Sequence, residues 1–238
     1  MSKLSLLGKK LLVVGGNSKI GAAVINKAAS LGVKVTSITK SGSAKSMGTS
    51  DSDIEWISGE SLEPKVFQSL LNEIDSVVQT SGIQLSPAIM TSSQKNTAKA
   101  IGTMLSQIGG KKMVYIEESR GLTSSTGTYV QTKQDIEQFL SGLPDLRLTV
   151  LRPGSIVDPE DKASGVYKFA KSFTGALAGL TGRVSMDTAS TDINAVAGSA
   201  VLAAFLNEYD GKILESEEMQ KIWEDFLSNK GGFHHSSV

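Results

Sequence analysis

Short apolar segments alternate with amphipathic segments along most of this chain. The apolar segments are rich in Val, Ile and Leu and are bounded by turn-forming residues, which is typical of buried strands. We predict strands at 10–15, 33–39, 54–58, 76–80, 113–117 and 146–152. The amphipathic segments predict helices at 20–31, 63–72, 93–107 and 128–140. This regular alternation predicts an α/β fold, a doubly wound parallel sheet with crossover helices.

The alternation ends after the sixth predicted strand, where Pro153 and Gly154 indicate a loop. Apolar residues then recur at helical spacing over 166–180, with lysines on or near the other face. Such a segment packs on the protein's own core, covers a substrate pocket, or makes peripheral contact with an anionic membrane. Two further helices are predicted at 192–206 and 217–227. We therefore expect one domain over 1–227, with a substrate-side region at about 153–190 and a disordered tail over 228–238.

The composition excludes several kinds of site. The chain has no cysteine, and its two histidines are adjacent, at 234 and 235 in a polar segment. Disulfides, thiolate metal sites and histidine-based triads are therefore not expected, and we predict no metal site. We also expect no nucleic-acid partner. No apolar run approaches the roughly 18 to 20 residues that a membrane span requires, so we expect a soluble or at most peripheral protein.

The formal net charge is zero, but the charges are unevenly distributed. Eight lysines precede the first acidic residue, Asp51. One interpretation is chance together with avoidance of repulsion near a phosphate site. The other is mitochondrial targeting, because import signals are basic and poor in acidic residues. Arginine is absent from this stretch and the first strand begins by about Leu11, so an uncleaved signal fits better than a removable presequence.

The first predicted strand runs directly into a glycine-marked turn and a helix, with residues 11–21 reading Leu-Leu-Val-Val-Gly-Gly-Asn-Ser-Lys-Ile-Gly. Gly15 permits the sharp turn and Gly21 permits close approach of the helix, while Ser18 stands where a middle glycine is usual and can donate its hydroxyl to a phosphate. Backbone N–H groups and the helix dipole converge at such a turn and form an anion site, which in a dinucleotide-binding fold holds the pyrophosphate. The predicted contacts are Gly15, Gly16, Asn17, Ser18, Lys19, Ile20 and Gly21.

Other candidate residues follow the next strands. Thr39, Lys40 and Ser41 end the second strand, where a carboxylate is usual for NAD and a basic residue suits the extra phosphate of NADP. Lys40 therefore favours NADP(H) over NAD(H), although it also fits an exposed lysine that starts a polar loop. Later strand ends predict contacts to adenine and to the cofactor's sugar, or else ordinary loops. These residues are Glu60, Ser61 and Leu62 after the third strand, and Thr80, Ser81 and Gly82 after the fourth.

A Y-x-x-x-K pattern follows the fifth strand, at Tyr129 and Lys133. Thr128 and Gln131 have capping-box spacing, which predicts a helix that Tyr129 opens and Gly142 closes. Helical spacing then places Tyr129 and Lys133 on one face. The lysine charge lowers the pKa of the phenol from its usual value of about 10, so the phenol can exchange a proton with a substrate oxygen.

Taken in this order, the motifs resemble the short-chain dehydrogenase/reductase superfamily in its atypical or extended branch. The resemblance implies a Rossmann-type fold, a bound NAD(P)(H) and a small C-terminal substrate-side region. It also implies Tyr129 as the acid/base and Lys133 as a residue that holds the nicotinamide ribose and tunes the phenol. Ser119 is the nearest candidate for the third member, with Ser124 and Ser125 behind it, and Pro153 is assigned to the cofactor site.

Three segments, at 13–17, 55–59 and 151–154, resemble a narrower group, the fungal mitochondrial NAD(P)-binding proteins of the coenzyme Q biosynthesis complex. These are related to the nucleotide-binding accessory subunit of respiratory complex I. This resemblance implies coenzyme Q biosynthesis proteins as partners. It also implies a location on the matrix side of mitochondria, with peripheral contact to the inner membrane as one option. If the N-terminal lysines are not a targeting signal, a cytoplasmic location is expected instead.

Three hypotheses for the function follow. The first is a cofactor-binding accessory protein that supports coenzyme Q (ubiquinone) synthesis. The second is an active NADPH-dependent reductase or isomerase of a lipophilic, quinone-like carbonyl substrate, in which Tyr129 and Lys133 act. Glu117 and Glu118 precede Ser119 and would oppose a developing oxyanion unless they point away or bind a partner. The third is a regulatory module without a cofactor.

Overall fold

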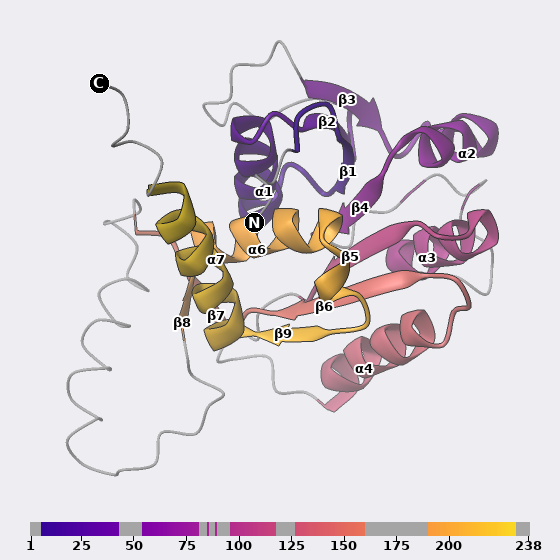
Figure 1. Ribbon diagram of the computed structural model, residues 1–238. Helices are drawn as coiled ribbons and strands as arrows, with labels where there is room; N and C mark the ends of the chain where they lie inside the picture. The colour runs from indigo at the N-terminus through magenta and orange to yellow at the C-terminus, as the bar shows by residue number, and fades with distance from the viewer. Residues whose placement is uncertain are drawn as a thin grey trace.

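A computed structural model of the 238-residue chain describes residues 6–42, 54–80, 85, 89, 96–117, 127–159 and 190–231. Its centre is a seven-stranded sheet whose strands are all parallel, in the order β3-β2-β1-β4-β5-β6-β9 (Figure 1). The strands are β1 (Lys10–Val14), β2 (Lys34–Thr39), β3 (Ile54–Ser58), β4 (Ser76–Gln79), β5 (Lys112–Ile116), β6 (Arg147–Arg152) and β9 (Ile213–Glu215). A separate parallel pair consists of β7 (Ser155–Val157) and β8 (Ser190–Asp192). The predicted doubly wound parallel sheet is confirmed.

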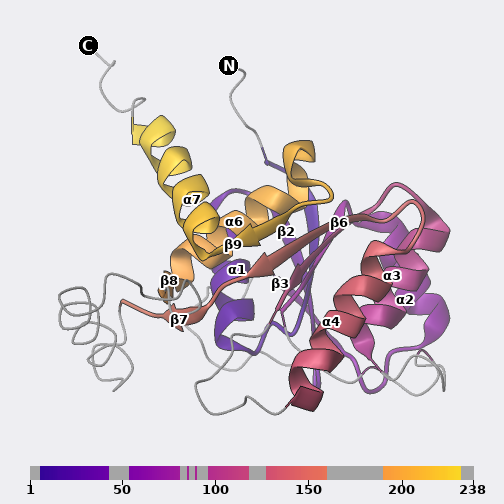
Figure 2. The same ribbon diagram turned by 90° about the horizontal axis from the view of Figure 1, so that it is seen from below.

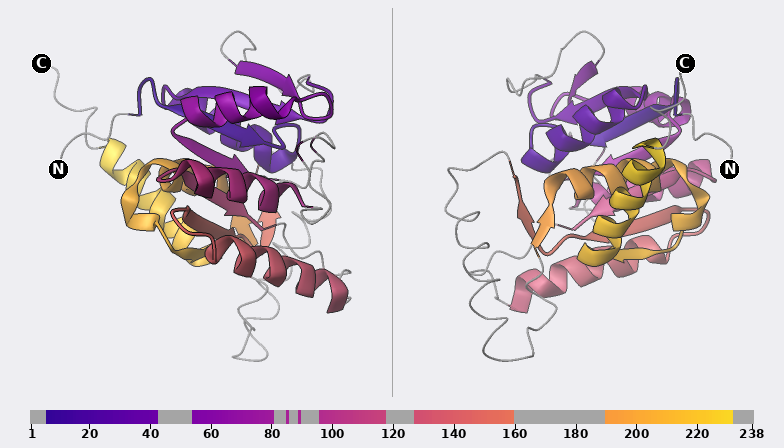
Figure 3. Two further views of the ribbon diagram at one scale, coloured as in Figure 1. Left: turned by 90° about the vertical axis from the view of Figure 1, so that its right-hand side faces the viewer. Right: turned by 60° about the vertical axis from the view of Figure 1, so that its left-hand side comes forward.

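Helices cover both faces of the sheet (Figure 2). One face carries α1 (Lys19–Ser30), α6 (Ile193–Phe205) and α7 (Ser216–Gly231), and a short 3₁₀ turn, η3 (Asn207–Tyr209), follows α6. The other face carries α2 (Pro64–Glu73), α3 (Thr97–Ile108) and α4 (Gly127–Ser141). The two views of Figure 3 show these layers in turn, with α2, α3 and α4 on the left and α1, α6 and α7 on the right.

The sheet separates two hydrophobic clusters, and β1 supplies both. Leu11 and Val13 lie in the cluster beneath α1 and α6, while Leu12 and Val14 lie in the cluster beneath α2, α3 and α4. This division follows from the period-two alternation of side chains along a strand. A strand that is apolar on both faces therefore occupies the middle of the sheet.

Helix α6 is buried along almost its whole length because it lies between the sheet and α7. A Cβ atom at Gly198 would lie 2.1 Å from the ring of Trp223, so only glycine permits this helix–helix contact. On the neighbouring helix α1, the ammonium of Lys27 lies 4.4 Å from the centre of the same ring. The three helices of this face therefore meet at Trp223.

Most predicted elements begin or end within one or two residues of the observed ones. Three short strands, β7, β8 and β9, were not predicted, because three-residue strands have no periodic hydrophobic pattern. The predicted start of the third helix at 93 is also wrong, because Asn96 caps that helix by accepting from the Ala98 N–H at 2.9 Å.

Two further predicted ends are corrected by the structure. Thr128 is not the N-cap of α4, because the helix already includes Gly127, and capping-box spacing alone does not define a first turn. Helix α7 continues past the predicted end at 227 to Gly231, so the predicted tail cannot begin at 228. The apolar side of α7, which includes Trp223 and Phe226, keeps the helix packed close to this end.

The predicted amphipathic segment at 166–180 lies outside the described residues, as does 232–238. Within the described part of the chain, none of the helices combines the length and the hydrophobicity that crossing a membrane requires.

Candidate functional site

The site predicted from the sequence lies at the carboxyl edge of the sheet, beside β1. Because every strand of the main sheet is parallel, all the strand carboxyl ends meet at one edge. Strand β1 lies between β2 and β4, so successive strands are added on opposite sides of it. Open α/β sheets bind ligands in the crevice outside such a switch point. The predicted pyrophosphate loop at 15–21 starts there.

The turn after β1 has room for backbone only. Gly15 has a φ of 96°, a conformation that side chains disfavour, and its N–H donates to the Ile38 carbonyl at 2.9 Å. A Cβ at Gly16 would lie 2.1 Å from the hydroxyl oxygen of Ser37. A Cβ at Gly21 would lie 2.2 Å from the Gly15 carbonyl oxygen. The first turn of α1 therefore approaches the end of β1 as closely as a backbone can.

Ser18 begins α1 as its N-cap. Its hydroxyl oxygen accepts from the Gly21 N–H at 2.9 Å, and the hydroxyl lies 2.9 Å from the Gly15 carbonyl oxygen, to which it donates. It is also 3.2 Å from the hydroxyl oxygen of Thr80, which in turn donates to the Val14 carbonyl at 3.0 Å. The structure thus brings the loop and the end of β4 into one hydrogen-bonded network. In this network the Ser18 hydroxyl donates its proton to the Gly15 carbonyl and not, as predicted from the sequence, to a phosphate.

This turn fits a pyrophosphate group. The N–H groups that begin a helix have no carbonyl of their own helix to bond, and the helix dipole adds partial positive charge there. Gly16 and Gly21 let the loop and the first turn of α1 pack directly on the ends of β1 and β2, so those N–H groups lie at the sheet edge where a phosphate could reach them. Asn17, Lys19 and Ile20 complete the loop, and the Lys19 ammonium lies 3.6 Å from the Asp158 carboxylate, just beyond β7. The sequence did not indicate that contact.

The ends of β2 and β3 lie side by side at the same edge. Lys40 follows β2, and its ammonium lies 3.4 Å from the carboxylate of Glu60, which follows β3. Two further predicted contacts, Ser41 and Ser61, are adjacent to this pair in the chain. By contrast, the side chain of Leu62 is only 4% exposed and packs in the core beside α2, so a contact to cofactor from this residue would come from its backbone.

Thr39 is also buried at this edge. Its hydroxyl oxygen accepts from the Gly42 N–H at 3.0 Å. The residue therefore shapes the turn that carries Lys40.

Arg152, the last residue of β6, joins several elements at this edge through ion pairs. Its guanidinium donates to both carboxylate oxygens of Glu137 on α4, at 2.7 and 2.8 Å, and to Glu215 at the end of β9 at 3.2 Å. Its Nε also lies 3.8 Å from Glu117, directly after β5. The hydrogen bond to Glu137 raises the pKa of Arg152 above its usual value, although burial opposes this. Pro153 follows, buried.

The predicted acid/base residues are described only in part. Tyr129 and Lys133 lie on the backbone of α4, at eight and four positions before Glu137, and their side chains lie outside the described part of the structure. Ser81, Gly82, Glu118, Ser119, Ser124 and Ser125 also lie outside it. The structure does show where Glu117 points. Its carboxylate is directed toward Arg152, which compensates its charge.

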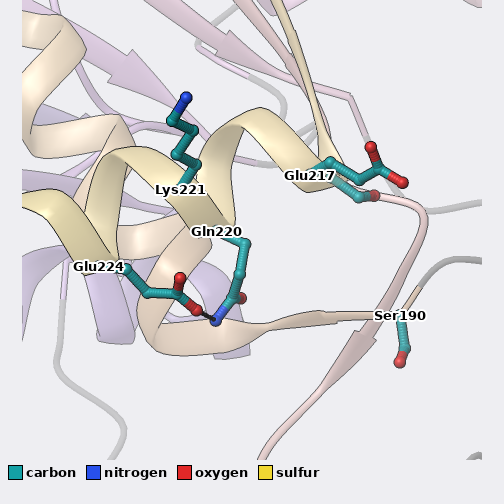
Figure 4. Close-up of a pocket in the computed structure, with 6 residues that line it drawn as sticks. Ser190, Glu217, Gln220, Lys221 and Glu224 are labelled. Carbon is teal, nitrogen blue, oxygen red and sulfur yellow. Dashed lines mark hydrogen bonds between the residues drawn. The ribbon is translucent and has the colours of Figure 1, made fainter.

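A shallow pocket of about 280 Å³ lies elsewhere, between the outer side of α7 and Ser190 at the start of β8 (Figure 4). Its polar lining comes mostly from α7, where Gln220 donates to Glu224 at 2.8 Å within the same helix. The sequence predicted none of these residues as a site. Among the described residues, no group of three or more histidine, aspartate or glutamate side chains could hold a metal ion.

Comparisons with known proteins agree with this geometry. Residues 15–184 match the protein family described as NAD(P)H-binding. An epimerase of the methanogen Methanothermobacter thermautotrophicus is 17% identical, with a TM-score of 0.61, over 94% of this chain and 78% of its own. The Bordetella bronchiseptica enzyme WbmG, solved with NAD, is 16% identical, with a TM-score of 0.60, over 94% of this chain and 79% of its own.

The yeast methylglyoxal/isovaleraldehyde reductase, solved with NADPH, is 16% identical, with a TM-score of 0.57, over 87% of this chain and 75% of its own. At these identities the likeness concerns the fold. No curated protein sequence matches the chain.

Replacing the capping serine tests its structural role. Ser18→Ala should lower the free energy of unfolding by about 1 kcal/mol, because the Gly21 N–H loses its acceptor. Urea titration followed by circular dichroism measures this. Ser30→Ala, which removes a hydroxyl at the exposed far end of the same helix, should change stability by less than about 0.5 kcal/mol. Equal losses in the two variants would contradict the assigned role of Ser18.

Replacing Arg152 tests the carboxylate cluster. Arg152→Met should lower the free energy of unfolding by about 2–4 kcal/mol, because the carboxylates of Glu117 and Glu137, 13% and 17% exposed, would lose the guanidinium charge that faces them. The same urea titration applies. Glu215→Gln is the matched control, since that carboxylate is 57% exposed and its loss should cost about 0.5 kcal/mol or less. A loss in Arg152→Met as small as in the control would show that the cluster is not stabilising.

Proposed function

The chain belongs to the NAD(P)H-binding family, and from this premise we propose that the loop at 15–21 and the neighbouring strand ends bind NADP(H). The observation that carries the proposal is the backbone-only turn at the switch point, where Cβ atoms at Gly16 and Gly21 would clash. This close packing sets the first N–H groups of α1 at the carboxyl edge of the sheet, where such groups bind phosphate in dinucleotide-binding folds. The adenosine half would extend across the ends of β2 and β3, toward Lys40 and Glu60.

We propose further that the protein is an accessory component of coenzyme Q biosynthesis in mitochondria. The support is the resemblance of three segments, at 13–17, 55–59 and 151–154, to that group of proteins, together with the acid-free N-terminal stretch. In this role the dinucleotide acts as a structural or sensing ligand, since a ligand that binds only the native state stabilises it. Other coenzyme Q biosynthesis proteins would be its partners.

The dinucleotide proposal predicts direct binding. Titration of the purified chain with NADPH and with NADH, followed by calorimetry, should give binding of both, with NADPH the tighter. At about 100 times its dissociation constant, NADPH should raise the free energy of unfolding by about 2.7 kcal/mol. Lys40→Met should weaken NADPH binding and leave NADH binding unchanged, because only NADPH carries the extra phosphate. A chain that binds neither dinucleotide would leave the cofactor-free regulatory module as the better hypothesis.

A second candidate function is that of an NADPH-dependent reductase of a quinone-like carbonyl. The observation that favours it is the direction of Glu117 and Glu137, whose carboxylates face Arg152. Glu117 and Glu118 are the carboxylates after β5 that would oppose an oxyanion. The charge of Glu117 is compensated by Arg152. In this function bound NADPH supplies hydride, and the phenol of Tyr129 donates a proton to the carbonyl oxygen while the charge of Lys133 favours the phenolate.

Substitution of the tyrosine separates these two functions. If the chain is a reductase, it oxidises NADPH in the presence of phenanthrenequinone as a carbonyl probe, and Tyr129→Phe should lower this rate by about 100-fold or more. NADPH affinity, measured by calorimetry, should stay the same. Wild-type protein that binds NADPH without turnover supports the accessory role instead. Equal turnover by wild type and Tyr129→Phe would exclude the proposed acid/base mechanism.

A further inference from the structure

Hydrogen bonds and a close backbone contact join the strand ends that carry Lys40 and Glu60. The Gly59 N–H donates to the Thr39 carbonyl at 2.8 Å, and the Ser58 hydroxyl donates to the Lys40 carbonyl at 3.1 Å. At Gly42, where φ is 74°, a Cβ would lie 2.7 Å from the Ser58 nitrogen. The backbones of Lys40 and Glu60 are thus positioned by the sheet edge and by this close turn.

The two side chains, by contrast, are exposed to solvent. Lys40 is 76% exposed and Glu60 is 57% exposed, with 3.4 Å between ammonium and carboxylate. An exposed ion pair of this kind is weak, so the ammonium can leave its partner at little cost. A phosphate bound beside Lys40 must nevertheless compete with the Glu60 carboxylate for the Lys40 ammonium.

We propose that Glu60 is a specificity-determining residue, which limits the preference for NADPH by holding the ammonium of Lys40. This inference rests on the proposed dinucleotide site. The extra phosphate of NADPH has to draw the ammonium away from the Glu60 carboxylate, whereas NADH has no group that needs it. The Lys40–Glu60 pair therefore weakens the binding of NADPH but not of NADH, and so reduces the difference between the two affinities.

The size of the effect follows from the exposure of the pair. Exposed lysine–carboxylate pairs contribute little, which corresponds to a change of about two- to fivefold in a dissociation constant. The interaction is electrostatic and near the surface, so added salt should screen it. A packing role for Glu60 would not respond to salt in this way.

The test is the variant Glu60→Gln. Glutamine keeps the size of the side chain and an oxygen that can accept from adenine, but it removes the charge. Calorimetry at low salt should show the ratio of NADPH affinity to NADH affinity rising about two- to fivefold, and this rise should shrink at 0.5 M salt, where screening is stronger than at about 0.1 M. Glu73→Gln is the matched control, because that exposed carboxylate pairs with Lys10 at 3.7 Å near the opposite ends of the strands and should change neither affinity.

A double variant tests whether Glu60 acts through Lys40. In Lys40→Met, which has no ammonium to restrain, the added Glu60→Gln change should no longer tighten NADPH binding. If Glu60→Gln tightened NADPH binding equally in the Lys40→Met variant, Glu60 would act by direct repulsion of the phosphate. That result would overturn the proposal that Glu60 acts by holding Lys40. An unchanged NADPH-to-NADH ratio in Glu60→Gln alone would also overturn this inference, while the proposed function would stand. A wild-type chain that binds neither dinucleotide would overturn both.

Discussion

The backbone contact between Gly15 and Gly21 is the constraint on which the arrangement of the site depends. The carbonyl of one residue lies where a side chain of the other would be, at 2.2 Å from a Cβ position. This contact places the start of α1 directly over the end of β1, and Ser18 maintains it by capping the helix. From there α1 packs on α6, and α6 packs on α7 through Gly198 and Trp223. The turn proposed as the anion site thus also positions the first helix of one helical layer.

A second organising feature is the pairing of charges along the carboxyl edge. Lys19 lies beside Asp158, Lys40 beside Glu60, and Arg152 among three carboxylates. Each of these three basic groups is therefore matched by an acidic group from another part of the chain. An anionic ligand that bound one of these basic groups would exchange an ion pair for its own contact. Such an exchange costs little for exposed groups and more for buried ones.

The strands and helices were largely predictable because their patterns are local. Val13 and Val14 lie on opposite faces of a buried strand, and a run of apolar residues indicates such a strand without any knowledge of its neighbours. The role of Gly21 was also predictable, because glycine spacing reflects a backbone requirement. Strand β9 was not predictable from the sequence. Its three residues, 213–215, form a strand only because they pair with the edge of β6. The pairing of Glu117 with Arg152 could not be predicted from the sequence either, because α4 separates the two residues along the chain.

The sequence alone therefore determined the kind of fold, the place of the glycine turn after β1 and the residue types at each strand end. These properties depend on local spacing, on glycine at a few positions and on residue type. The tertiary structure decided how those residues are used. Ser18 caps a helix, Lys40 faces Glu60, and Arg152 joins β5, β6, β9 and α4. Such contacts depend on which distant strand ends the parallel sheet brings to one edge, and no local pattern in the chain records that.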